Sequence, residues 1–150
     1  MAPAVTGVLE TCLYVDDMAR ARAFYETVLG LRSMVAEDRL TVYDAGPASA
    51  LILFLRGDTT TPVKLPGGTI PPHDGHGPLH FALAVPADSL GEWRRQLAAH
   101  EVAIEGEMAW RAGSTSLYFR DPDNHLVELA TPGLWPNYPA GPARTQVLHP

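Results

Sequence analysis

Residues 13–31 read LYVDDMARARAFYETVLGL, and this stretch holds the end of a strand, a helix and a helix stop. Asp16 or Asp17 can cap the helix, because an aspartate carboxylate accepts hydrogen bonds from the unpaired amides at a helix start. Apolar residues then recur at helical spacing, and Gly30 supplies the C-terminal stop. The stretch therefore predicts an amphipathic helix preceded by a strand over residues 8–15, where apolar side chains alternate.

The same order of elements recurs in the second half of the chain. Residues 79–85 predict a strand, and Asp88 or Ser89 precedes a second apolar stripe of helical spacing. Strand-like pieces follow the two helices, near 31–36, 39–44 and 50–55 and near 102–109, 114–120 and 125–131. Each half thus reads βαβββ, and Glu10 of the first strand matches His80 at an offset of 70 residues. The repeat predicts a duplicated module.

Proline and glycine mark the boundaries of the two modules. Residues 57–78 hold five glycines and five prolines among 22 residues, a composition that predicts a linker without regular structure. We therefore expect a single domain over residues 1–150. Its predicted parts are module one at about 5–56, the linker 57–78, module two at about 79–131 and a proline-rich tail at 132–150.

Composition narrows the class of protein. The 150 residues carry a net charge of −6, which disfavours binding to a nucleic-acid phosphate backbone. No apolar run approaches the 18 residues that a membrane span needs, and the first ten residues do not resemble a secretory signal, so we expect a cytoplasmic protein. The single cysteine, Cys12, excludes an intrachain disulfide framework.

Strand parity places polar side chains on one face of each predicted sheet. Leu9, Leu13 and Val15 are expected beneath the first helix, which turns Glu10 and Tyr14 to the opposite face. By the same alternation, His80 and Glu128 point away from the helix layer of module two. A sheet face that carries two carboxylates and an imidazole predicts a cup around a polar ligand or metal, since buried carboxylates need a cation or a proton.

A second stretch, LYFRDPDNHLVEL at residues 117–129, contains a strand, an Asp-Pro-Asp-Asn turn and a further strand. Together with residues 13–31, it makes residues 7–135 resemble the vicinal oxygen chelate superfamily. This group includes glyoxalases, extradiol dioxygenases, fosfomycin-resistance thiol transferases and bleomycin-binding proteins. The resemblance implies an α+β fold, in which two βαβββ modules form a cupped mixed sheet.

The resemblance also implies a metal site. Members of the superfamily take metal ligands from the first and last strands of each module, which here are Glu10, Leu53, His80 and Glu128. Leu53 cannot bind a metal, which leaves Glu10, His80 and Glu128 for one divalent ion, either Fe, Mn, Zn, Ni or Mg. The alternative is a polar pocket without metal, in which His80 hydrogen-bonds to Glu10.

Other candidate site residues follow from position. Tyr118 has the spacing from Glu128 of a tyrosine that reaches the substrate in the thiol transferases, and a phenol there can protonate an oxyanion. The alternative is a wall aromatic whose hydroxyl meets water. Ser116 shares the parity of Tyr118, Tyr14 is expected to line the pocket, and Arg111 is either a partner for an anionic substrate or a solvated loop cation.

Two further histidines, His73 and His76, lie in the segment PPHDGHGP before His80. The surrounding glycines and prolines favour a solvated loop or a lid over the cup. The alternative is a second metal site.

These observations leave three functions open. The first is a metal-dependent enzyme, a lyase, isomerase or dioxygenase, that chelates a small oxygen-rich substrate and stabilises an enolate or oxyanion. The second is a metal-free protein that sequesters a small molecule, as bleomycin resistance proteins do. The third is a regulatory or scaffold module without chemistry. Superfamily members are usually homodimers, so the two modules are expected to pair within one chain or by exchange between two chains.

Overall fold

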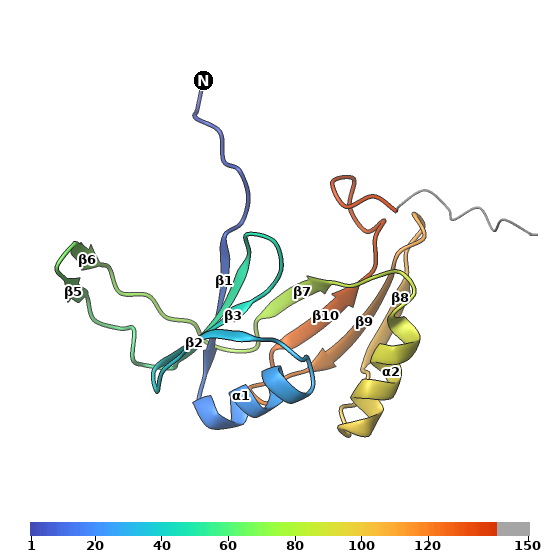
Figure 1. Cartoon of the computed structure of the whole chain (residues 1–150), viewed down its shortest axis with the longest axis horizontal. Helices are drawn as coiled ribbons and strands as arrows, with labels where there is room; N and C mark the ends of the chain where they lie inside the picture. The colour runs from blue at the N-terminus through green and yellow to red at the C-terminus, as the bar shows by residue number, and fades with distance from the viewer. Residues whose placement is uncertain (141–150) are drawn as a thin grey trace, which may run out of the picture. The chain divides into compact units, whose positions relative to one another are not determined.

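The structure, a computed structural model, describes residues 1–140 and divides into two compact units (Figure 1). Unit 1 comprises residues 1–79 and 121–125, and unit 2 comprises 80–120 and the chain from 126 onward. The last ten residues of the predicted tail, 141–150, lie outside the described part. Among the described residues, no helix has the length and apolar character to cross a membrane.

Unit 1 contains the first βαβββ module. Its elements are β1 (Glu10–Val15), α1 (Met18–Thr27), β2 (Ser33–Ala36), β3 (Leu40–Asp44) and β4 (Ala50–Leu55). The sheet order is β1-β4-β3-β2, with β1 and β4 parallel and the other pairs antiparallel. Of the two candidate caps, Asp17 begins the helix, because its carboxylate accepts a 2.9 Å hydrogen bond from the amide of Arg20.

Unit 2 repeats this arrangement. Its elements are β7 (His80–Ala84), α2 (Leu90–Ala99), β8 (Gly106–Ala109), β9 (Thr115–Arg120) and β10 (Leu126–Ala130). The sheet order, β7-β10-β9-β8, matches that of unit 1 strand for strand. Ser89 occupies the N-cap position of α2, but its hydroxyl donates to the carbonyl of Pro86. The prediction of an α+β fold built from two βαβββ modules is confirmed.

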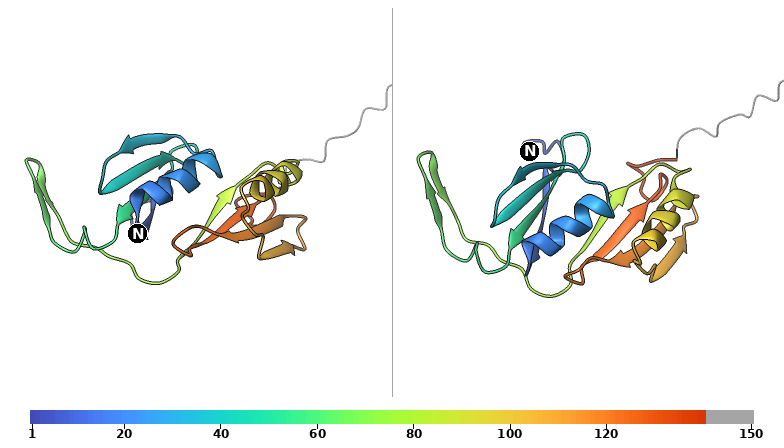
Figure 2. Two further views of the ribbon diagram at one scale, coloured as in Figure 1. Left: turned by 90° about the horizontal axis from the view of Figure 1, so that it is seen from below. Right: turned by 60° about the horizontal axis from the view of Figure 1, so that its bottom comes forward.

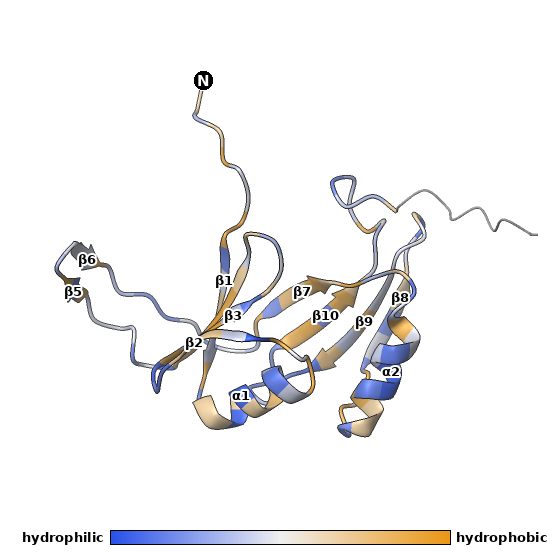
Figure 3. Cartoon of the chain, viewed as in Figure 1, coloured by the Kyte–Doolittle hydropathy of each residue, from blue (hydrophilic) through white to orange (hydrophobic). Residues whose placement is uncertain are grey.

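One face of each sheet supplies the apolar core, and Figure 3 shows that strands such as β3 and β10 are rich in hydrophobic residues. The fully buried core side chains include Leu13, Val15, Leu51 and Leu53 in unit 1 and Leu97, Leu117, Phe119, Val127 and Leu129 in unit 2. The expectation that Leu9 packs beneath the helix is wrong. Leu9 precedes β1 and is 69% exposed.

The linker contains a hairpin, so the prediction that residues 57–78 lack regular structure is wrong. Strands β5 (Val63–Leu65) and β6 (Gly68–Ile70) pair antiparallel, and Figure 2 shows them as an arm that extends from the sheet of unit 1. The prolines at 62, 66 and 71 lie at the ends of these strands and not within them. They therefore permit pairing, because proline removes a backbone donor only at its own position.

The linker then returns across the sheet at Gly75. A Cβ atom at Gly75 would lie 2.4 Å from Cδ2 of Tyr14, closer than any real contact. The guanidinium of Arg56 holds this segment, because it donates to the carbonyls of Gly75 and Tyr14 and contacts the carboxylate of Asp16 at 2.7 Å. Because the segment is held this close to the ring of Tyr14, only glycine fits at position 75.

Replacement of Gly75 with alanine is therefore expected to lower the free energy of unfolding by about 1–3 kcal/mol, because the buried Tyr14 ring must shift. Urea denaturation followed by circular dichroism measures this change. Gly67→Ala is the matched control, since nothing lies within 4 Å of its added Cβ. Equal free energies of unfolding for the two variants would contradict the close approach.

The turn between β9 and β10 leaves the sheet of unit 2 and belongs to unit 1. The carboxylate of Asp121 accepts a 2.8 Å hydrogen bond from the Tyr25 hydroxyl and further bonds from the amides of Asp123 and His125. Tyr25 is fully buried, and burial followed by the charge of Asp121 raises the pKa of its phenol. The residue Asn124 completes the turn with a φ of 67°, which asparagine tolerates.

His125 is fully buried and uses both ring nitrogens. The amide of Leu79 donates to Nδ1 at 2.9 Å, and Nε2 lies 2.9 Å from the carbonyl oxygen of Tyr14. Because a carbonyl only accepts, Nε2 carries the proton and the ring is neutral. His125 is thus a structural residue that ties the turn to β1 of unit 1.

Candidate functional site

His80 and Glu128 lie on the same face of the sheet of unit 2. In the parallel pairing of β7 with β10, Glu128 is opposite Ala82, two residues beyond His80. His80 Nε2 is 3.3 Å from Glu128 Oε2. The carboxylate is 7% exposed and the imidazole 50% exposed, so a ligand can reach the pair from the side of the histidine.

A backbone contact determines which ring nitrogen of His80 carries the proton in the neutral form and which one has a free lone pair. Nδ1 lies 3.0 Å from the carbonyl oxygen of Leu126, which can only accept, so Nδ1 carries the proton. In the neutral ring, Nε2 then presents its lone pair to Glu128 Oε2. Two acceptors at this distance need a proton or a cation between them, and an oriented imidazole next to a carboxylate is a donor set that divalent metals accept. The pair therefore fits the metal that the sequence predicts.

Tyr118 is directly opposite Glu128 in the antiparallel pairing of β9 with β10. Its hydroxyl donates to Glu128 Oε1 at 3.0 Å, which leaves Oε2 for His80. Burial raises the pKa of the Tyr118 phenol, and the charge of Glu128 adds to the effect, whereas a hydrogen bond with Ser116 opposes it. The phenol is therefore protonated at neutral pH and can donate its proton.

Alkaline titration tests this assignment. The pKa of every tyrosine in the protein is raised, and burial is the largest cause at each: Tyr14, Tyr25, Tyr43, Tyr118 and Tyr138. The phenolate absorbance at 295 nm is therefore expected to rise at higher pH in the folded protein than in the unfolded chain, whose tyrosines ionise near the ordinary pKa of about 10. The stabilisation from the buried neutral phenols is present below pH 10 and lost as the pH rises above it. A phenolate step at the ordinary pKa in the folded protein would contradict the prediction, and unfolding in guanidinium should restore that step.

The other two predicted substrate-binding residues of unit 2 differ in environment. Ser116 is fully buried, and its Oγ accepts a 2.9 Å hydrogen bond from Trp110 Nε1. Arg111 is exposed in the loop between β8 and β9 and makes no hydrogen bond or ion pair with residues 1–140. Their roles toward a substrate stay predictions.

Glu10 begins β1 in unit 1, opposite Ala50 of β4. It is exposed, and its carboxylate has no hydrogen-bond or ion-pair partner among the described residues. Within the described part of either unit alone, no three His, Cys, Asp or Glu side chains gather as a metal group. The assignment of Glu10 as the third ligand stays a prediction.

The strand pairing corrects the choice of Leu53 as the counterpart of Glu128, which rests on the resemblance. In unit 1 Glu10 is opposite Ala50, and in unit 2 His80 is opposite Leu126. Glu128 lies two residues after Leu126, so its counterpart lies two residues after Ala50 and is Ile52. Leu53 lies one residue further along the strand, on the buried face of the sheet, where it is opposite Leu13. Ile52, the residue in the position equivalent to Glu128, also cannot bind a metal.

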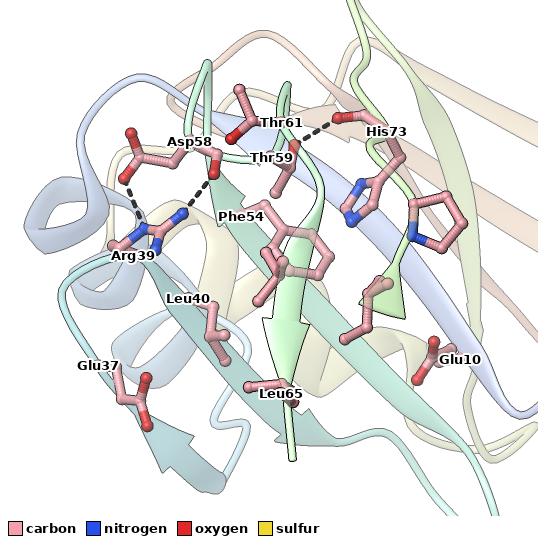
Figure 4. Close-up of a pocket in the computed structure, with 13 residues that line it drawn as sticks. Glu10, Glu37, Arg39, Leu40, Phe54, Asp58, Thr59, Thr61, Leu65 and His73 are labelled. Atoms are coloured by element: carbon pink, nitrogen blue, oxygen red, sulfur yellow. Dashed lines mark hydrogen bonds and ion pairs between the residues drawn. The ribbon is translucent and has the colours of Figure 1, made fainter. Parts of the chain in front are cut away.

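A cavity of about 510 Å³ lies in unit 1 between the sheet and the hairpin (Figure 4). Its apolar lining residues are Leu40, Phe54, Val63, Leu65, Ile70 and Pro71. Its polar lining residues are Glu10, Glu37, Arg39, Asp58, Thr59, Thr61 and His73. Sequence reasoning missed this cavity, since half of its apolar wall comes from the unexpected hairpin.

Tyr14 and His73 act together beside the cavity. The Tyr14 hydroxyl is 2.8 Å from His73 Nδ1, and the His73 ring packs edge-on against Phe54 with centroids 4.8 Å apart. Tyr14 is buried and does not line this cavity; it contacts His73, which does. His76 is exposed and pairs with Asp74 at 3.1 Å. Within the described residues of unit 1, neither histidine joins a group that could form the second metal site.

Comparisons with known proteins agree with this architecture. The family model of the Glyoxalase/Bleomycin resistance protein/Dioxygenase superfamily matches residues 7–129. The crystal structure of lactoylglutathione lyase from Agrobacterium tumefaciens is 30% identical, with a TM-score of 0.80 over 89% of this chain and 99% of that one.

Two further proteins are also similar. Metallothiol transferase FosB from Bacillus licheniformis is 23% identical over 130 residues, which cover 85% of this chain and 76% of that protein. The fosfomycin resistance protein FosX from Listeria monocytogenes, crystallised with Mn(II) and sulfate, is 19% identical. It has a TM-score of 0.62 over 85% of this chain and 91% of that one, and it shares the fold.

Proposed function

The chain belongs to the glyoxalase/bleomycin resistance protein/dioxygenase superfamily, and from that premise we propose that it is a metal-dependent enzyme acting on a small oxygen-rich substrate. The observation that carries this proposal is the pair formed by His80 and Glu128. Nδ1 of His80 contacts the carbonyl oxygen of Leu126, which leaves Nε2 facing a nearly buried carboxylate, an arrangement that needs a proton or a cation between the two atoms and that a divalent metal would complete.

His80 and Glu128 would hold one divalent ion, with Glu10 as the third ligand. Iron, manganese, zinc, nickel and magnesium all accept such a nitrogen and oxygen donor set. When bound, the metal would supply Lewis acidity that stabilises negative charge on a substrate oxygen. In the similar FosX protein the crystallised ion is Mn(II).

Tyr118 is the proposed proton donor. Its hydroxyl is oriented by Glu128 Oε1, and its raised pKa keeps the proton on the phenol until a more basic oxyanion forms nearby. This role favours lyase or isomerase chemistry by proton transfer, with ring-cleaving oxygenation as the alternative reaction. We also propose a homodimer, in which Glu10 and the unit 2 ligands come together within one chain or between two.

Metal analysis tests the proposal directly. The protein is purified without chelator or affinity-tag metal, reconstituted with each of the five ions, and analysed by inductively coupled plasma mass spectrometry. We expect about one ion per chain in the wild type and a loss of that ion in His80→Ala. His100→Ala is the matched control, because His100 is exposed at the end of α2. Absence of metal after every reconstitution would contradict the proposal and favour a metal-free binding protein.

A further inference from the structure

The cavity of unit 1 is lined by apolar side chains and by carboxylates, and this lining favours one class of ligand. We propose that it binds a small molecule whose apolar body carries a positively charged amine. This deepens the proposed function by naming a substrate class, although every residue that lines the cavity belongs to unit 1 and binding there needs no metal. The volume of about 510 Å³ lies within the range of small-molecule sites.

Apolar side chains form two facing walls of the cavity. Leu40 and Phe54 come from neighbouring strands of the sheet, where they are directly opposite each other. Leu65 and Ile70 come from the hairpin and are 55% and 49% exposed in the absence of a ligand. A hydrocarbon body placed between the walls would remove this apolar surface from water, which is the main favourable term for such a ligand.

The charges around the walls are predominantly negative. The carboxylates of Glu10 and Glu37 make no hydrogen bond or ion pair with any described residue, whereas the backbone carbonyl of Glu37 accepts a hydrogen bond from Arg22. In Figure 4 the two carboxylates lie on opposite sides of the apolar residues Leu40 and Leu65. A ligand that fills the apolar space therefore meets a carboxylate whichever way it is oriented.

The cation that lines the cavity is already neutralised. Arg39 Nε contacts Asp58 Oδ2 at 3.1 Å, and the guanidinium also donates to the carbonyl of Asp58. His73 is occupied at Nδ1 by the Tyr14 hydroxyl. An anionic ligand would thus meet a carboxylate in either orientation without a free cation, whereas an amine is attracted to whichever carboxylate it reaches and to the ring of Phe54, whose face attracts cations.

Three probes with one apolar body and different head groups test the proposal: 4-phenylbutylammonium, 4-phenylbutanol and 4-phenylbutanoate. Binding is measured by NMR titration of the full chain at low salt in the presence of a chelator, so that no metal contributes. We expect the ammonium compound to bind most tightly and the carboxylate least. Resonances of Leu40, Phe54 and Leu65 should shift on binding.

Two variants separate charge from apolar contact. Glu37→Gln is expected to weaken the ammonium probe about 2- to 5-fold relative to the alcohol, the scale of an exposed ion pair. Asp38→Asn is its matched control, an exposed neighbour outside the cavity. Leu65→Ser is expected to weaken all three probes about 3- to 10-fold, with the exposed Met34→Ser as control.

Equal affinities for the three probes, tighter binding of the carboxylate, or no binding at millimolar concentration would each overturn the proposal. The same holds if Asp38→Asn and Glu37→Gln change the affinities equally. The outcome is distinct from that of the metal analysis. If the ammonium probe binds selectively but no metal binds in the separate reconstitution analysis, this inference is upheld and the proposed metal enzyme is rejected; metal binding without selective binding of the probe would do the reverse.

Discussion

Replacement of Glu128 with glutamine is expected to lower metal affinity by more than about 100-fold, because even residues that only orient a ligand contribute 10- to 100-fold. The same substitution is expected to leave the melting temperature unchanged or raised. Glutamine has the shape of glutamate and removes a nearly buried charge. Its amide can donate to the lone pair on His80 Nε2, while its oxygen keeps the bond from Tyr118. Loss of affinity without loss of stability identifies a residue kept for function.

Competition with a chromophoric chelator measures the affinity, and differential scanning calorimetry measures the melting temperature. The matched control is Glu107→Gln, a carboxylate on β8 that pairs with Arg94 and has no contact with His80. Unchanged metal affinity in Glu128→Gln, or an equal decrease in Glu107→Gln, would be inconsistent with a metal bound at Glu128.

Replacement of Asp121 with alanine is expected to lower the free energy of unfolding by about 3–4 kcal/mol. The substitution removes the acceptor for three hydrogen bonds at once, among them the 2.8 Å bond from the hydroxyl of the fully buried Tyr25. Tyr25→Phe removes one of these bonds from the other side, so we expect a smaller loss of about 1–2 kcal/mol.

Urea denaturation of Asp121→Ala, Tyr25→Phe and the double variant measures these losses and their coupling. Because the two side chains share a hydrogen bond, the double variant should lose less than the sum of the single variants. A loss below about 1 kcal/mol in Asp121→Ala, or strict additivity, would show that this network does not stabilise unit 1.

Local patterns were sufficient to predict the modules. The aspartate pair before Met18 and the helical spacing of apolar residues placed α1 to within a residue, since capping and amphipathicity are local properties. Period-two alternation correctly predicted that Glu10 and the buried Leu13 lie on different faces of their sheet, and that His80 and Glu128 lie on the same face of theirs.

Features that depend on distant contacts could not be predicted in this way. The hairpin at Val63–Ile70 is compatible with the nearby prolines because they flank the short strands, whereas composition alone counted them as breakers. Leu53 was placed one residue away from the true counterpart of Glu128, because register across strands is set by pairing. The bonds of His125 to Leu79 and Tyr14 join residues that are far apart in the chain.

The hairpin arm, residues 63–70, can evolve separately from the two four-stranded sheets. It lies outside both βαβββ modules, and it supplies a wall of the cavity without pairing with either four-stranded sheet. Changes in residues 63–70 are therefore expected to leave the strands that carry His80 and Glu128 intact. A library randomised only in the arm would explore new ligand preferences on an unaltered scaffold, and natural drift in this segment would let descendants diversify their substrates.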